Sequence, residues 1–112
     1  MGTIETPNKN EYVLTLSTGE DFNQEIKGNL NSLIVDSDEP ISITIESSLG
    51  YLIFHNSQHN GIRYYAPRAV MQGSIEHIAV KDQFDKFKLN EDIYIRVSGP
   101  TNTQVKVIIR LD

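Results

Sequence analysis

Residues 93–111 decide the fold, and their sequence is IYIRVSGPTNTQVKVIIRL. Apolar and polar side chains alternate in two runs, Ile93–Val97 and Val105–Leu111, and a segment rich in turn-forming residues lies between them. Such alternation is typical of a half-buried strand, because successive side chains of a strand point to opposite faces. The stretch therefore predicts a β-hairpin of two paired antiparallel strands.

The rest of the chain carries the same signal in shorter pieces. Further strands are expected at residues 12–17, 22–35, 41–46, 51–54 and 62–67. The second of these is interrupted by Lys27–Asn29, so it is either two short strands or one bulged strand. Asp36–Pro40 and Asn56–Gly61 are predicted turns, since aspartate, asparagine, proline and glycine favour them.

Residues 70–88 are the hardest to interpret. A short strand at residues 75–80 followed by an ordered loop is expected, and a single helical turn is the alternative. About eight strands in all predict an all-β fold, an antiparallel β-sandwich or jelly-roll-like barrel. Residues 1–10 are polar and are expected to form a flexible N-terminal arm in front of a single domain at residues 11–112.

Composition excludes several classes of protein. The chain has 112 residues and no cysteine, so disulfides, thiolate metal sites and a cysteine nucleophile are ruled out. Its net charge is −5 and its basic residues are scattered, which disfavours nucleic-acid binding. The N-terminus lacks the basic and apolar regions of a signal peptide, and no apolar run approaches the ~20 residues of a membrane span. We therefore expect a soluble protein made without a cleaved export signal.

Histidine spacing raises the question of a metal site. His55 and His59 have the H-x3-H spacing that forms a metal pair on a helix, where positions i and i+4 share a face. Here the spacing straddles a strand end and a turn, and His77 is far away in sequence. Loop histidines are the favoured interpretation, and a small metal-dependent barrel enzyme is the remote alternative.

Acidic clusters are interpreted in the same way. Asp36, Asp38 and Glu39 could bind calcium, but an acidic turn is the simpler explanation because the EF-hand pattern is absent. A two-carboxylate hydrolase is a weak hypothesis, and its candidate residues are Asp82, Asp85, Glu91 and Asp92. No serine-nucleophile or phosphate-loop motif occurs. The sequence thus predicts no catalytic residue, no metal ligand and no cofactor, and hence a protein that is not an enzyme.

The residues that stand out belong to an expected interface. Tyrosine and arginine are enriched at protein interfaces, and Tyr64 and Tyr65 must face opposite sides of a strand. Ile108 lies on the face of its strand opposite to the core-facing Val107 and Ile109, which leaves apolar surface for another subunit to cover. The predicted interface residues are Arg63, Tyr64, Tyr65, Arg68 and Ile108.

Residues 62–68 and 85–89, with the terminal hairpin containing Ser98 and Gly99, resemble the layout of small β-sandwich accessory proteins of tailed-bacteriophage virions. The resemblance implies a capsid decoration, cementing or other accessory protein that forms homo-oligomers and docks on a virion shell. It also implies synthesis in the host cytoplasm and localisation in the virion. The alternative is a carbohydrate- or ligand-binding module that stacks ligands on Tyr51, Tyr64 or Tyr65, although the chain has no tryptophan.

Overall fold

The computed structural model describes residues 3–72 and 79–112, and the side chains of residues 4–68 and 86–112. It confirms the all-β antiparallel prediction. The strands are β1 (Thr3–Asn8), β2 (Glu11–Ser17), β3 (Asp21–Ser47), β4 (Leu52–Tyr65), β5 (Ala69–Gln72), β6 (Ala79–Asp85), β7 (Lys88–Ser98) and β8 (Gln104–Leu111). Six of them form one hydrogen-bonded sheet, and β5 and β6 form a separate two-stranded ribbon, so the sandwich itself has fewer strands than the eight expected.

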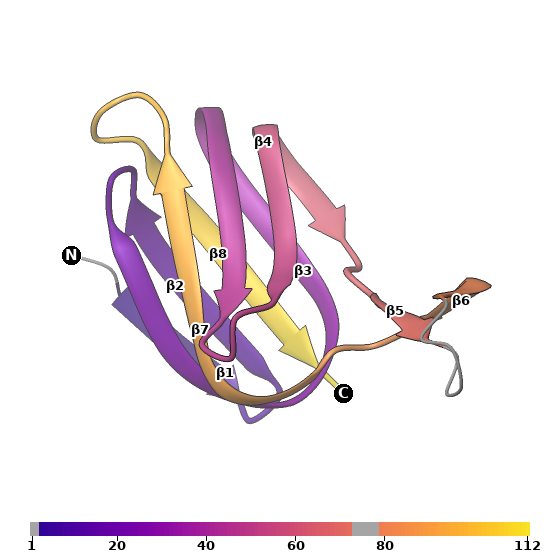
Figure 1. Ribbon diagram of the computed structural model, residues 1–112. Helices are drawn as coiled ribbons and strands as arrows, with labels where there is room; N and C mark the ends of the chain where they lie inside the picture. Colours follow the sequence, from indigo (N-terminus) through magenta and orange to yellow (C-terminus); the bar gives the residue numbers. More distant parts are fainter. Residues whose placement is uncertain (1–2, 73–78) are drawn as a thin grey trace.

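The six-stranded sheet is folded into two layers that face each other (Figure 1). Layer A is ordered β3 (residues 21–29), β7, β3 (residues 42–47) and β4 (residues 52–56). Layer B is ordered β1, β2, β8, β3 (residues 30–37) and β4 (residues 61–65). The long strands β3 and β4 therefore belong to both layers, and the β5–β6 ribbon projects to one side.

The core lies between the layers and is aliphatic. The alternation read from the sequence is confirmed, because Val105, Val107, Ile109 and Leu111 are all buried. Ile41, Ile43 and Ile45 also point inward, as their spacing predicts. Each such side chain contributes about 1.5–3 kcal/mol by leaving water, so the period-two pattern places the side chains that drive the two layers together.

The predicted terminal hairpin is wrong. Both of its strands exist, but in the described residues β7 pairs only with β3, and β8 pairs with β2 and β3. The connecting residues 99–103 instead cross from layer A to layer B. Thr18 ties this crossing down, since its hydroxyl donates to the Pro100 carbonyl at 2.6 Å and its amide donates to the Thr103 carbonyl at 2.9 Å.

The two predicted turns are also wrong, because the chain does not reverse direction at either of them. At Asp36–Pro40 the strand β3 continues and passes from layer B to layer A, and at Asn56–Gly61 the strand β4 crosses beside it. Pro40 sits in the register break between Ser37 and Ile41, where a missing backbone N–H is tolerated. Residues that usually reverse a chain here bend two paired strands together.

The N-terminal residues differ from the expected loose arm. Thr3–Asn8 form the edge strand β1, which pairs with β2 through Ile4 and Leu14 among other partners. Of the predicted strand at residues 75–80, residues 75–78 lie outside the described part of the chain, and residues 79–80 begin β6. The described residues contain no helix that is long and apolar enough to cross a bilayer.

Lys27–Asn29 is resolved as part of one continuous strand that leaves layer A for layer B. Gly28 has a φ of +138°, and a Cβ added there would lie 3.3 Å from Leu111 Cδ1. The backbone conformation favours glycine at this position, and an added Cβ would also require the Leu111 side chain to shift by a few tenths of an ångström.

Gly28→Ala is expected to lower the free energy of unfolding by about 2–3 kcal/mol, since it adds backbone strain and crowds the Leu111 side chain. Gly19→Ala is the matched control, because Gly19 has a φ of +87° and nothing within 4 Å of an added Cβ. It should cost only about 1 kcal/mol, the strain alone. Urea unfolding of both variants measures the difference, and equal losses would contradict the steric part of this explanation.

Candidate functional site

An apolar row crosses the outer face of layer B. The register places Val13 opposite Ile108, Ile108 opposite Ile34, and Ile34 opposite Tyr64. We call these four residues the apolar row. Tyr64 is 62% exposed, and the three aliphatic residues are half-buried. The row extends from one strand to the next over four neighbouring strands, so it is a continuous apolar strip rather than one stray side chain.

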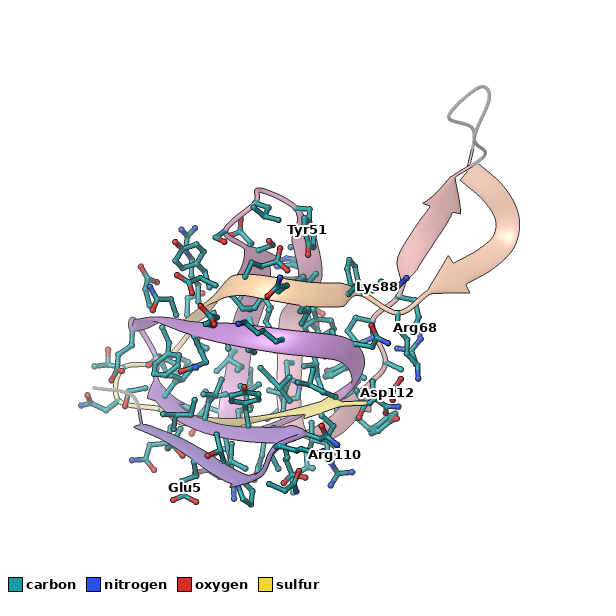
Figure 2. All side chains as sticks on the ribbon, turned by 90° about the horizontal axis from the view of Figure 1, so that it is seen from below. Glu5, Tyr51, Arg68, Lys88, Arg110 and Asp112 are labelled. Carbon is teal, nitrogen blue, oxygen red and sulfur yellow. The ribbon has the colours of Figure 1, made fainter. Side chains whose placement is uncertain are left out.

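Charged residues flank the apolar row on both sides. On one side, Arg110 forms an ion pair with Glu11, with its Nε 3.6 Å from Oε2. On the other side, Lys106 and Asp36 are cross-strand neighbours, but within the described side chains neither forms an ion pair in its own chain. Figure 2 shows Glu5 and Arg110 on the side of layer B that faces away from the core.

The outer face of layer A is more polar, although Leu52 and Tyr94 are exposed on it. Asp21, Arg96, Thr44 and His55 lie in register across it. Arg96 forms ion pairs with Asp21 at 4.0 Å and with Glu46 at 3.5 Å, and the Thr44 hydroxyl is 2.8 Å from His55 Nδ1. These exposed groups satisfy each other in water. The apolar strip therefore marks layer B as the more suitable protein-binding face.

The predicted interface residues do not share one surface. Tyr64 and Ile108 lie on the outer face of layer B, and Arg63 is exposed on the edge strand but in register with the core residue Val35. Tyr65 points inward, as the alternation with Tyr64 requires. Arg68 is half-buried, and its Nη1 donates to the Asn31 carbonyl at 3.0 Å, so it fastens the segment after β4 to β3.

The sequence did not reveal that Ile34 and Val13 lie on either side of Ile108. The sequence shows that each belongs to an alternating strand, but not which strands are neighbours. Only the register of β2, β8 and β3 brings them into the same row as Ile108.

Tyr65 belongs to a polar network inside the sandwich. Its hydroxyl is 2.7 Å from His59 Nδ1 and accepts a hydrogen bond from Asn56 Nδ2 at 2.9 Å. His59 Nε2 is 2.8 Å from the Gly61 carbonyl, which can only accept. This fixes the proton of the neutral ring on Nε2 and leaves Nδ1 to accept from Tyr65. These hydrogen bonds satisfy the polar groups that lie inside the sandwich where β4 bends.

His59 was expected in a loop, but it is fully buried. A bulge explains the difference: Ile43 pairs with Asn56 and Ile41 pairs with His59, so β4 has one residue more than β3 between these pairs. The extra residue turns His59 inward while His55 remains outside. The two rings therefore do not converge as a metal pair.

The other candidate ligands are also dispersed. The described residues contain no group of three or more histidine, aspartate or glutamate side chains placed to hold a metal ion. Asp36 is half-buried within β3, and Asp38 and Glu39 are exposed where that strand crosses between layers. The side chains of Asp82 and Asp85, and His77, lie outside the described part of the chain.

Glu91 is held by its neighbours. It accepts from the Ser47 hydroxyl at 2.7 Å and from the Tyr51 hydroxyl at 3.0 Å. Burial opposes its ionisation, but the hydrogen bonds from Ser47, the Asn90 amide and Tyr51 outweigh it and lower the pKa of Glu91. Burial, with the hydrogen bond and charge of Glu91, raises the pKa of Tyr51 against an opposing contribution from Ser47. The Tyr51 ring also stacks on Phe87, so it is a packing residue.

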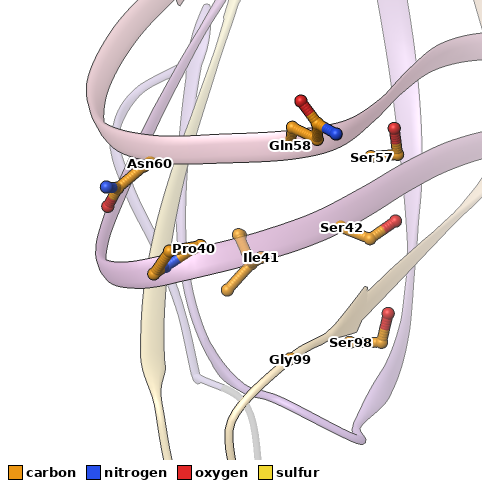
Figure 3. Close-up of a pocket in the computed structure, with 8 residues that line it drawn as sticks. All are labelled: Pro40, Ile41, Ser42, Ser57, Gln58, Asn60, Ser98 and Gly99. Carbon is orange, nitrogen blue, oxygen red and sulfur yellow. The ribbon is translucent and has the colours of Figure 1, made fainter.

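A shallow pocket of about 570 Å³ lies where β3, β4 and β7 meet. Its polar lining is uncharged and consists of Ser42, Ser57, Gln58, Asn60 and Ser98. Figure 3 shows the three serines in a column across the three strands. Gly99 also lines it, and a Cβ there would lie 3.1 Å from the Pro40 carbonyl oxygen. The lining offers hydroxyl and amide groups without charge.

Comparison with known proteins leaves the family open. No protein-family model matches the chain, and no curated protein matches it. Among solved structures, an RmlC-like cupin protein from Desulfovibrio desulfuricans is similar, with 10% identity and a TM-score of 0.44, over 98% of this chain and 80% of the other. At that identity and TM-score, the likeness assigns neither a family nor an activity.

Tyr65→Phe is expected to lower the free energy of unfolding by about 1–3 kcal/mol, because it leaves His59 Nδ1 and the Asn56 amide without a partner inside the protein. Tyr64→Phe removes the same hydroxyl from the exposed neighbour and should change stability by less than about 0.5 kcal/mol. Chemical denaturation compares the two variants. Equal effects would show that the internal network does not stabilise the fold.

Proposed function

We propose that this protein is a non-enzymatic assembly module that binds protein through the outer face of layer B. The observation that carries the proposal is the apolar row. Water contact with Ile34, Ile108 and Tyr64 is unfavourable, and a partner that covers the row removes it. On layer A the exposed Tyr94 and Leu52 are separated by Glu46, so these three positions form no continuous apolar row, and this contrast supports the choice of face.

A place in the virion of a tailed phage, as a decoration, cementing or other accessory protein, is part of this proposal. Its support is the sequence resemblance, together with a face suited to repeated protein contacts. Homo-oligomers and a shell surface are the partners it implies. The genes that flank this one provide a direct test: capsid, portal and protease genes are expected, and a sugar-processing operon would contradict the virion assignment.

Ile108→Lys is expected to weaken self-association at least tenfold, because it places a charge at the centre of the apolar row. Leu52→Lys is the matched control: Leu52 is 56% exposed and lies on layer A, so its replacement should leave association unchanged. Sedimentation equilibrium over a range of protein concentrations measures both effects.

Two outcomes would contradict the assembly proposal. One is a wild-type chain that remains monomeric at millimolar concentration. The other is an Ile108→Lys variant that associates as strongly as wild type while Leu52→Lys does not. Thermal unfolding of each variant establishes that the monomer is folded, so that loss of association is not loss of structure.

A second candidate function is binding of a neutral, hydroxyl-rich ligand such as a carbohydrate. The uncharged lining of the pocket in Figure 3 favours it, since serine hydroxyls and side-chain amides pair with sugar hydroxyls. The tyrosines first considered as stacking surfaces do not line this pocket: Tyr51 packs on Phe87, Tyr65 is inside, and Tyr64 faces outward on layer B.

For this second function, glucose, galactose and mannose at millimolar concentration are expected to shift the amide NMR signals of Ser42 and Ser98. Ser42→Val should abolish the shifts by removing a central hydroxyl. Ser48→Val, at an exposed serine that does not line the pocket, should retain them. An absence of shifts with all three sugars would exclude this class of ligand.

A further inference from the structure

The charges beside the apolar row carry information about its partner. Lys106 and Asp36 are neighbours in the next row across layer B, which continues from Thr15 through these two residues to Ile62. In the described side chains neither forms an ion pair in its own chain, whereas Arg110 is already paired with Glu11. Each of these two residues can therefore form an ion pair with an opposite charge on a partner surface.

We propose that the partner on this face is a second copy of the chain, related by a two-fold axis that runs along the strands between β8 and β3. This inference rests on the proposed function and specifies its geometry. The axis exchanges β8 with β3 and β2 with β4. It places Ile108 over the partner's Ile34 and Val13 over the partner's Tyr64, so the two apolar rows cover each other.

The same rotation also brings opposite charges together across the interface. Lys106 lies over the partner's Asp36, and Asp36 lies over the partner's Lys106, so that two ion pairs form at once. A two-fold interface must be self-complementary, because the same patch serves both sides. Here the exchange of neighbouring strands meets that requirement, because one of the two strands carries the lysine and the other carries the aspartate in the same row.

The other two-fold axis in the plane of this face runs along the apolar row itself. It places each strand over its own copy and brings Lys106 over the partner's Arg110. Two positive charges would then face each other twice, an arrangement that like-charge repulsion disfavours. The charge pattern thus selects the axis along the strands, with the layers packed face to face as in aligned sheet packing.

The small size of the face favours a weak dimer. β8 spans about 27 Å and the four strands β2, β8, β3 and β4 together cover about 20 Å, so the two copies together bury roughly 1,000 Å², near the lower end of specific interfaces. A dimer of micromolar dissociation constant is expected. Sedimentation equilibrium at protein concentrations around that value observes both monomer and dimer.

The test exchanges charges between two separate variants. Lys106→Glu alone and Asp36→Lys alone each put like charges together twice across the axis, so each variant should dimerise at least tenfold more weakly than wild type. In an equimolar mixture, a heterodimer of the two variants regains both opposite-charge pairs. The mixture should therefore dimerise within about threefold of wild type. Asp38→Lys, at an exposed aspartate two positions along β3, replaces Asp36→Lys in the control mixture. It keeps Lys106 and Asp36, so it should dimerise with itself, but fluorescently labelled Lys106→Glu should stay monomeric beside it and should enter dimers only in the mixture with Asp36→Lys.

The outcomes separate this inference from the proposed function. If Ile108→Lys abolishes association but the mixture of charge variants does not restore it, the assembly face stands and the axis along the strands is overturned. If Lys106→Glu strengthens the dimer, the axis along the apolar row is correct instead. If wild type does not self-associate, both proposals fall. Urea unfolding of each single variant establishes that its monomer is folded.

Discussion

One strand that serves both layers is the constraint on which the structure depends. β3 pairs with β7 in layer A, with β8 in layer B, and with β7 again after it returns. Each crossing must bend the backbone without leaving buried polar groups unpaired. Gly28 permits the first crossing, Pro40 lies in the second, and the bulge of β4 with the buried His59 accompanies that second bend. The aliphatic core can form only when these bends hold the layers face to face.

The same arrangement determines which surfaces are free. The strands of layer B lie side by side with their outward side chains in register, and this turns isolated residues of four strands into one apolar row with charges beside it. Ile108 by itself would be an ordinary exposed isoleucine. Its significance comes from Val13 and Ile34 on the strands at either side, and from a lysine and an aspartate with no ion-pair partner among the described side chains of their own chain.

The sequence allowed the fold class and the direction of each side chain to be predicted, because alternation reports faces directly. It correctly places Val105, Val107 and Ile109 inside, and Tyr64 and Tyr65 on opposite sides. Alternation does not report partners. The short link between β7 and β8 is equally compatible with a hairpin and with a crossing between layers, and Asn60–Gly61 marks a bend as well as a reversal. The inward turn of His59 depends on one extra residue in β4 relative to β3, which no local pattern in the sequence announces.

The continuity of β3 also bears on how the molecule comes apart. A sandwich made of two independent sheets can lose one sheet while the other persists. Here the middle of β3 is the partner of β8, and both of its ends are partners of β7. Disrupting either layer therefore also disrupts β3, which is part of the other layer. We therefore expect the two layers to unfold as a single cooperative unit, with amide protons at the centres of β7 and β8 exchanging with solvent only through global unfolding.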